Sequence, residues 1–182
     1  MTDNLTKADA THNFLGIPIV GDIASGSTRV PQITKEEFAA LLKPVLDHPD
    51  VHLLGWRQYT PYFNDGDVCE FSAHEVWLVT NNDLEQYKDL AENDPYMLEA
   101  KLAVGRERHP TLGGRPYHWD DDNRMVYEDY QGDHQDLYDA ANALSEAIES
   151  GKSDHVLIDL FGDHCQVLVY KDKIEVEDYS HD

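Results

Sequence analysis

Two apolar runs on either side of a tight-turn signal constrain the fold of this chain most strongly. The runs cover residues 51–62 and 68–80, and the segment between them contains Asn64, Asp65 and Gly66. These residue types tolerate the positive φ of a tight turn, so the pattern predicts an antiparallel β-hairpin. Alternating polarity in the second run predicts one shared face for Cys69, Phe71, Ala73, Trp77 and Val79. Glu75 is the exception, because it is an acid on that apolar face.

Helix signals follow and precede this hairpin. A first helix is predicted from Thr34, which with Glu37 has the capping-box pattern, to Pro49. Further helices are predicted at about residues 82–91, 95–104 and 134–150. Asp94 and Asp133 are the expected N-caps of the last two. Gly105 and Gly151 follow their ends. The apolar stripe of the last helix consists of Leu137, Ala141, Leu144 and Ile148.

The C-terminal part predicts a three-strand meander with strands at residues 156–160, 165–170 and 174–176. Together these elements indicate an α+β fold in a single domain, residues 1–182. An antiparallel sheet, made of the N-terminal hairpin and the C-terminal meander, would pack with three to four helices. We expect residues 1–13 to be flexible. Residues 105–132 form a long irregular segment with one short strand at 125–127.

The charge of the chain excludes several classes of partner. The chain has 14 basic and 36 acidic residues, which gives a formal net charge of −22. Direct binding of nucleic acid or of an anionic membrane is therefore not expected. A hydrophobic content of 41% still suffices for a packed core. We expect the two cysteines, Cys69 and Cys165, to be reduced, buried thiols. We also expect a cytoplasmic protein, because no 18-residue apolar run occurs.

Residues 105–132 also combine the side chains that dominate protein interfaces. Four of the six arginines lie there, together with Tyr117 and Trp119. Just beyond, residues 119–139 contain eight acids against one arginine. The candidate interface consists of Arg106, Arg108, Arg115, Tyr117, Trp119, Asp120, Asp121, Asp122, Asp129, Asp133, Asp136 and Asp139. Such acids can imitate a row of phosphates, but a solubilising face or adaptation to high salt is the plainer interpretation.

Metal binding is the alternative that the histidines raise. Four Asp-His pairs occur, at 47–48, 133–134, 154–155 and 163–164, where chance predicts about one. No zinc-finger or helical His-x-x-x-His spacing accompanies them, and no cofactor is predicted beyond a divalent metal. A site across strands was a further option, with His74 beside Glu70 and His155 beside Asp159, and with His164 nearby. A solvated polar sheet face is the plainer interpretation.

Three segments carry distinctive motifs. Residues 56–66 read WRQYTPYFNDG and are followed by Cys69 and by Phe71-Ser72. Residues 161–164 read FGDH, and residues 179–182 read YSHD. Together these motifs resemble a family of uncharacterised proteins from bacteria and their phages. The likeness covers about residues 52–80 and 155–182. The resemblance implies no activity and no catalytic residues. Our functional hypothesis is a binding protein, in particular a phage-type accessory or host-interaction factor.

The motifs predict a site as well as turns. If the two turns and the C-terminal residues converge at one end of the sheet, an acidic, histidine-bearing pocket forms from Asp65, Asp67, Asp163, His164, His181 and Asp182. The leading hypothesis is an acidic protein that binds a basic host or phage protein, in its sharpest form as a DNA-mimicking inhibitor. A metal-dependent enzyme that uses this pocket is the alternative. The oligomeric state stays open.

Overall fold

In the computed structural model the chain has an α+β fold, as predicted, with six helices among the described residues instead of three to four. The structure describes residues 13–14, 17–18, 30–63, 65–105 and 109–180. The helices are α1 (Lys35–Asp47), α2 (Asn81–Gln86), α3 (Lys88–Asn93), α4 (Pro95–Lys101), α5 (Gln135–Glu149) and α6 (Asp154–Phe161). The strands are β1 (Asn13–Phe14), β2 (Ile17–Pro18), β3 (Val51–Tyr59), β4 (Ser72–Thr80), β5 (Tyr117–Trp119), β6 (Met125–Tyr127), β7 (Cys165–Tyr170) and β8 (Ile174–Asp178).

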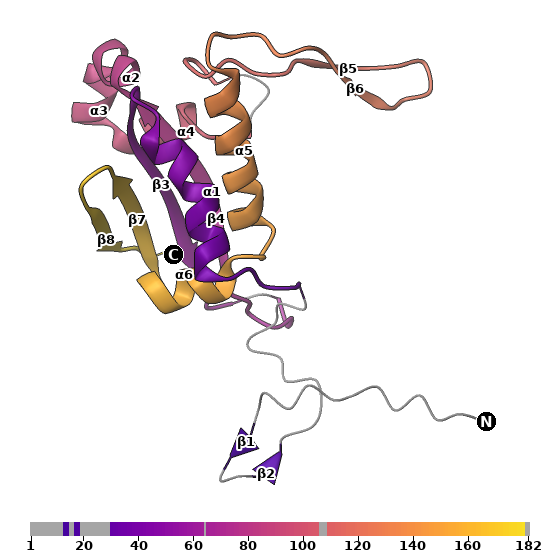
Figure 1. Cartoon of the computed structure of the whole chain (residues 1–182), viewed down its shortest axis with the longest axis vertical. Helices are drawn as coiled ribbons and strands as arrows, with labels where there is room; N and C mark the ends of the chain where they lie inside the picture. Colours follow the sequence, from indigo (N-terminus) through magenta and orange to yellow (C-terminus); the bar gives the residue numbers. More distant parts are fainter. Residues whose placement is uncertain (1–12, 15–16, 19–29, 64, 106–108, 181–182) are drawn as a thin grey trace.

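The main sheet is antiparallel and has the strand order β4-β3-β7-β8 (Figure 1). β1 pairs with β2, and β5 with β6, outside this sheet. The expected flexibility of residues 1–13 concerns residues that, apart from Asn13, lie outside the described part of the chain. None of the helices that the structure describes is long and apolar enough to cross a bilayer.

The predicted hairpin is formed by β3 and β4, but both strands are shorter than the apolar runs. β3 ends at Tyr59 and β4 begins at Ser72. A β-bulge then interrupts β4 at Glu75, whose φ is 56°. Because the extra residue reverses the alternation, Ala73 packs in one core and Trp77 in the other. The prediction that these two side chains share a face is wrong.

One face of the sheet is covered by α1 and α5 (Figure 1). The predicted capping box of α1 is confirmed, with Thr34 and Glu37 each accepting the other's backbone N–H. The predicted stripe of α5 is buried, and it packs with the fully buried Leu54 and Trp56 of β3 in one core. Asp133 is not the N-cap of α5, because that position belongs to His134, which makes no side-chain cap bond.

The other face of the sheet packs against α4, where Leu98 and Leu102 meet Trp77. The helix predicted at residues 82–91 divides at Tyr87 into α2 and α3. Asp94 caps α4 as predicted, but α4 ends at Lys101 because the chain then runs along β4. There the N–H of Leu78 donates to Leu102 O at 3.1 Å.

The C-terminal meander is a helix followed by two strands. β7 and β8 confirm two of its strands, but residues 156–160 belong to α6. Short apolar runs do not distinguish a strand from a buried helix. A contact distant in sequence stabilises the helix end, because the buried Gln58 amide donates to Leu157 O at 3.2 Å and also to Gly162 O.

Candidate functional site

The structure brings the two sequence motifs together at the end of β3. The Thr60 N–H donates to Asp163 Oδ1 at 2.9 Å, and the His164 N–H donates to the same oxygen at 2.8 Å. The His164 ring stacks on Tyr62, with a centroid distance of 4.7 Å. These contacts join the first motif, at Thr60 and Tyr62, to the Asp163-His164 turn, and the pocket itself stays a prediction.

Of the remaining members of the predicted pocket, Asp65 and Asp67 lie among the described residues. Asp65 lies in the turn with a φ of 42°, and Asp67 lines a shallow hollow with Phe63 and Glu70. His181 and Asp182 lie outside the described residues. Within the part of the chain that the structure describes, the His, Cys, Asp and Glu groups close enough to share a metal ion do not include any of this set.

The predicted cross-strand histidine site is not formed. His155 and Asp159 lie on α6 instead of a strand, and Asp159 forms an ion pair with Lys35. His74 does lie on β4, where its Nε2 contacts Ser72 Oγ at 2.6 Å. The error follows directly from the misassignment of α6.

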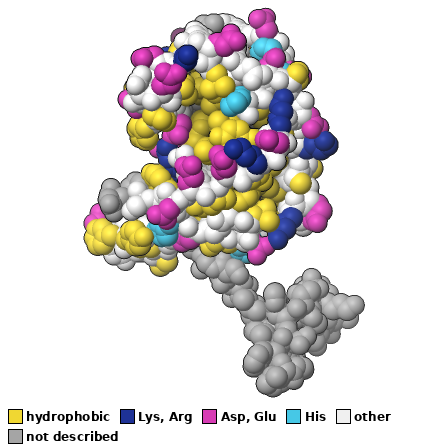
Figure 2. All heavy atoms as spheres, turned by 90° about the vertical axis from the view of Figure 1, so that its left-hand side faces the viewer, with side chains coloured by type: hydrophobic (Ala, Val, Ile, Leu, Met, Phe, Trp, Pro, Cys, Tyr) yellow, Lys and Arg dark blue, Asp and Glu magenta, His cyan; other side chains and the backbone are white. Residues whose placement is uncertain are grey.

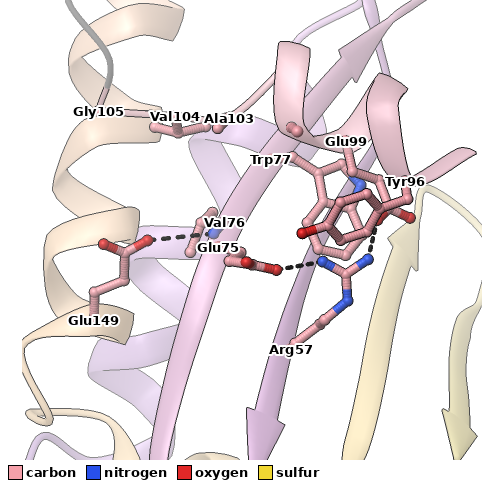
Figure 3. A pocket seen from close by; sticks show the side chains of 11 residues that line it. Arg57, Glu75, Val76, Trp77, Tyr96, Glu99, Ala103, Val104, Gly105 and Glu149 are labelled. Atoms are coloured by element: carbon pink, nitrogen blue, oxygen red, sulfur yellow. Dashed lines mark hydrogen bonds and ion pairs between the residues drawn. The ribbon is translucent and has the colours of Figure 1, made fainter. Parts of the chain in front are cut away.

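A buried ion-pair site that the sequence does not reveal is centred on Arg57 of β3 (Figure 3). The side chain is only 6% exposed, and its two terminal nitrogens donate to Glu75 and Glu99. Three aromatic rings surround the guanidinium group at 5.1–5.2 Å from their centroids. These are Trp77, Tyr96 and Tyr179.

Burial and pairing act in opposite directions on these charges. Burial lowers the pKa of Arg57, but Glu75 and Glu99 more than offset it, so the pKa lies above its ordinary value. Burial raises the pKa of Glu99, and Arg57 offsets only part of that rise. The site therefore depends on keeping its arginine, because Glu99 would otherwise be an unpaired buried carboxylate.

A cavity of about 360 Å³ opens beside this pair, between α4, β4 and α5 (Figure 3). Its charged lining consists of Arg57, Glu75, Glu99 and Glu149. Glu149 accepts from the Val76 N–H at 3.2 Å, next to the bulge. With three carboxylates and an already paired guanidinium group, the cavity favours cationic over anionic groups. The one signal in the sequence was Glu75, the acid on an apolar face.

The candidate interface contains a projecting β-hairpin, formed by β5 and β6 (Figure 1). The predicted strand at residues 125–127 is confirmed as β6. Cross-strand pairing puts four exposed side chains on one face of this hairpin, and we call them the hairpin surface: Tyr117, Trp119, Met125 and Tyr127. Trp119 is 56% and Tyr127 63% exposed. Tyr117 contacts both rings, so the cluster is continuous.

The charged members of the candidate interface divide into local partners and exposed acids. Asp139 pairs with Arg115 at 3.4 Å, and Asp120 accepts two backbone N–H groups within the hairpin turn. Asp122 pairs with Arg124 at 3.3 Å. The exposed acids further include Asp121, Asp129, Asp133 and Asp136. Arg106 and Arg108 lie outside the described residues.

Hydrogen bonds close the base of the hairpin and connect the chain before it to β4. Gly114 and Gln131 pair through both backbone groups, at 2.8 and 3.1 Å. The buried His109 contacts Leu78 O through Nε2 and accepts backbone N–H groups through Nδ1. Burial lowers the pKa of His109, which fits this neutral arrangement. The hairpin therefore leaves the body from a fixed base.

A second exposed apolar area lies at the β8 edge. Ile174 and Val176 are each 48% exposed there. Figure 2 views the molecule from this side and shows hydrophobic side chains gathered on the face, with charged side chains around them. These two residues provide a comparison for the hairpin surface.

Asp154, at the start of α6, carries a pH-dependent prediction. Burial raises its pKa to about 6, His155 opposes the rise, and Glu70 adds to it. Its Oδ1 has no hydrogen-bond partner among the described residues. The ordinary value is about 3.9, so the stability linked to protonation is complete below about pH 4 and is lost as the pH rises through about 6.

We expect the free energy of unfolding to fall between pH 5 and pH 8 by about 1 kcal/mol more in the wild type than in Asp154→Asn. Denaturant titrations at each pH measure this difference. Asp159→Asn is the matched control, since its carboxylate lies on the same helix but is 61% exposed. Parallel pH profiles for wild type and Asp154→Asn would contradict the prediction.

Comparison with known proteins adds no assignment to this geometry. No protein-family model matches the chain, and searches of curated proteins and of solved structures find no significant match. The function therefore has to be argued from the residues themselves.

Proposed function

We propose that the protein is a binding protein that recognises a basic protein partner through the hairpin surface. The observation that carries the proposal is the exposure of four large apolar side chains on one face of a projecting hairpin. Tyr and Trp contribute most to the binding energy of protein interfaces, and exposed apolar clusters mark interaction sites. Burial of these side chains against a partner would remove their apolar area from water.

Charge supports the choice of a basic partner. The turn and the strand end beside the hairpin surface carry Asp120, Asp121, Asp122, Glu128 and Asp129 against Arg124. The whole chain has a net charge of −22, which would accelerate the approach of a cationic protein. The fixed base of the hairpin lowers the conformational entropy lost on binding.

The narrower expectations of a phage-type host-interaction factor and of a DNA mimic remain part of this proposal. A DNA mimic would compete with DNA for the partner and would lose affinity steeply as salt rises. An interface dominated by the aromatic side chains would bind with weaker salt dependence. Titration of the isolated partner at several salt concentrations separates the two.

The proposal is tested by affinity capture from a bacterial lysate with the wild type and a Trp119→Ala/Tyr127→Ala variant. We expect a basic protein to bind the wild type, and its affinity to fall at least tenfold in the variant, because hot-spot aromatics contribute about 2 kcal/mol or more each. Ile174→Ala/Val176→Ala, at the exposed β8 edge, should bind normally. If the Trp119→Ala/Tyr127→Ala variant bound the partner as tightly as the Ile174→Ala/Val176→Ala variant, the hairpin surface would not be the binding site. Failure to capture any partner would also count against it.

A further inference from the structure

We propose that His48, Asp50 and His134 form a binding site for a divalent transition metal of the Zn²⁺ class. The ligand atoms of these three side chains all lie within 4.8 Å of one another. Imidazole nitrogens with one carboxylate suit Zn²⁺, Co²⁺ and Ni²⁺, whereas Mg²⁺ and Ca²⁺ favour sites made of oxygen ligands. The site lies at the opposite end of β3 from the pocket predicted from the sequence, and it does not depend on the hairpin surface.

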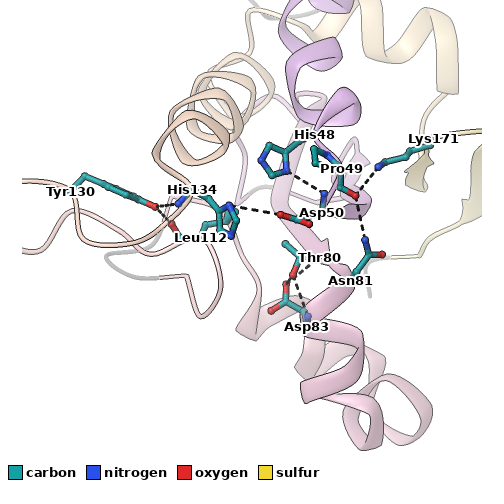
Figure 4. Close-up of polar contacts among 10 residues, drawn as sticks. All are labelled: His48, Pro49, Asp50, Thr80, Asn81, Asp83, Leu112, Tyr130, His134 and Lys171. Carbon is teal, nitrogen blue, oxygen red and sulfur yellow. Dashed lines mark hydrogen bonds and ion pairs between the residues drawn. The ribbon is translucent and has the colours of Figure 1, made fainter.

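The fold brings the three residues together from distant parts of the chain (Figure 4). His48 is the C-cap of α1, Asp50 directly precedes β3, and His134 is the N-cap of α5. Since α1 and α5 pack against each other, the two caps meet, with ring centroids 5.6 Å apart. His134 Nδ1 lies 3.9 Å from Asp50 Oδ2. One ion between these atoms would need only small side-chain movements.

The backbone of the first two ligands is held in place. Asp50 O accepts the Asn81 N–H at 2.8 Å, which fixes the loop to the end of β4. Pro49 O accepts from Lys171 Nζ at 3.0 Å and from Asn81 Nδ2 at 3.3 Å. These bonds fix the main chain between His48 and Asp50. The two ligand side chains therefore extend from a backbone that does not have to move when a metal binds.

The third ligand is held by a separate set of contacts. The His134 N–H donates to the Tyr130 hydroxyl at 3.0 Å, and that hydroxyl donates to Leu112 O. The carbonyl of His134 accepts the Tyr138 N–H at 2.9 Å. These contacts fix the main chain of His134, so metal binding has to order only its side chain.

Metal binding has two identifiable costs. The Asp50 N–H donates to His48 Nδ1 at 3.3 Å, near the long limit for a hydrogen bond. Coordination through either ring nitrogen ends this bond, because Nδ1 would then hold either the metal or a proton. Lys171 also places a positive charge nearby. The acidity of the chain acts in the opposite direction and favours cations.

The ligand count defines the type of site. Three protein ligands leave a fourth tetrahedral position for water, which is the arrangement of open zinc sites. His48 and His134 are half-buried and Asp50 is exposed, so an ion can reach them from solvent. Both histidines belong to Asp-His pairs in the sequence, but no local spacing indicates that Asp50 is their shared carboxylate partner.

The test is a titration of the purified full chain with ZnCl₂ by calorimetry, and with CoCl₂ by visible absorption. We expect one saturable Zn²⁺ site per chain and Co²⁺ absorption bands that indicate nitrogen and oxygen ligation. His48→Gln, Asp50→Asn and His134→Gln should each weaken Zn²⁺ binding at least tenfold. MgCl₂ at the same concentration should not compete.

His118→Gln is the matched control, because His118 lies 3.6 Å from Glu128 and lacks a third ligand nearby within the described residues. This variant should bind Zn²⁺ like the wild type. Thermal unfolding without metal verifies that each variant folds, and if one does not, the other two decide. The absence of saturable binding in the wild type, or unchanged binding in the ligand variants, would overturn the proposal.

Discussion

An Arg57→Met variant is expected to lose about 3–5 kcal/mol of unfolding free energy. Methionine retains apolar contact with Trp77 but removes the charge that compensates Glu99, whose side chain is only 13% exposed. Breaking a buried pair costs more than the pair contributes, because the remaining charge stays buried without a partner. Urea denaturation at neutral pH measures the loss. It should shrink as the pH falls, since protonation then neutralises Glu99.

Two further variants separate pairing from packing at this site. Glu75→Gln removes the other carboxylate that contacts Arg57, but its side chain is 53% exposed, so we expect a loss below about 1 kcal/mol. Arg57→Met combined with Glu99→Met should regain most of the lost stability, because no charge then remains buried. A double variant as unstable as Arg57→Met alone would contradict the electrostatic explanation.

Gly113→Ala is expected to destabilise the protein by about 3 kcal/mol or more and to disturb the base of the β5–β6 hairpin. Gly113 has a φ of 73°, and an added Cβ would overlap the carbonyl of Gln131 and approach Gly132 Cα to 2.9 Å. The overlap involves main chain, which cannot rotate away as a side chain can. The hydrogen bonds between Gly114 and Gln131 would therefore have to shift.

Gly105→Ala provides the comparison for this prediction. Gly105 has a similar φ of 80°, yet a Cβ there meets no atom within 4 Å. It should cost only the backbone strain, about 1–2 kcal/mol. Thermal unfolding compares the two variants. Equal losses at both positions would show that the Gln131 carbonyl moves without cost.

Elements encoded by local signals were predictable from the sequence. The Thr34–Glu37 capping box, the Asp94 cap and the stripe of α5 were each correct, because a cap or a helical period depends on residues within a few positions. The same applies to β7 and β8, whose turn residues and apolar alternation lie close together.

Features that depend on distant contacts could not be predicted. The bulge at Glu75 depends on Arg57 across the strand pair and on Glu149 of α5, which accepts from the neighbouring Val76. α6 was misassigned because its end is fixed by Gln58, about 100 residues away. The Arg57 site and the His48–His134 pair arise in the same way, since each needs the fold before its partners meet.

The edge strand β8 has a consequence for the behaviour of the chain in concentrated solution. β8 pairs with β7 on one side, and no described strand covers its other side. An open strand edge with exposed Ile174 and Val176 can pair with the same edge of a second molecule. Glu175, Glu177 and Asp178 alternate with or follow these residues, so two such edges repel each other. The acidity of this chain thus also protects it from edge-to-edge aggregation.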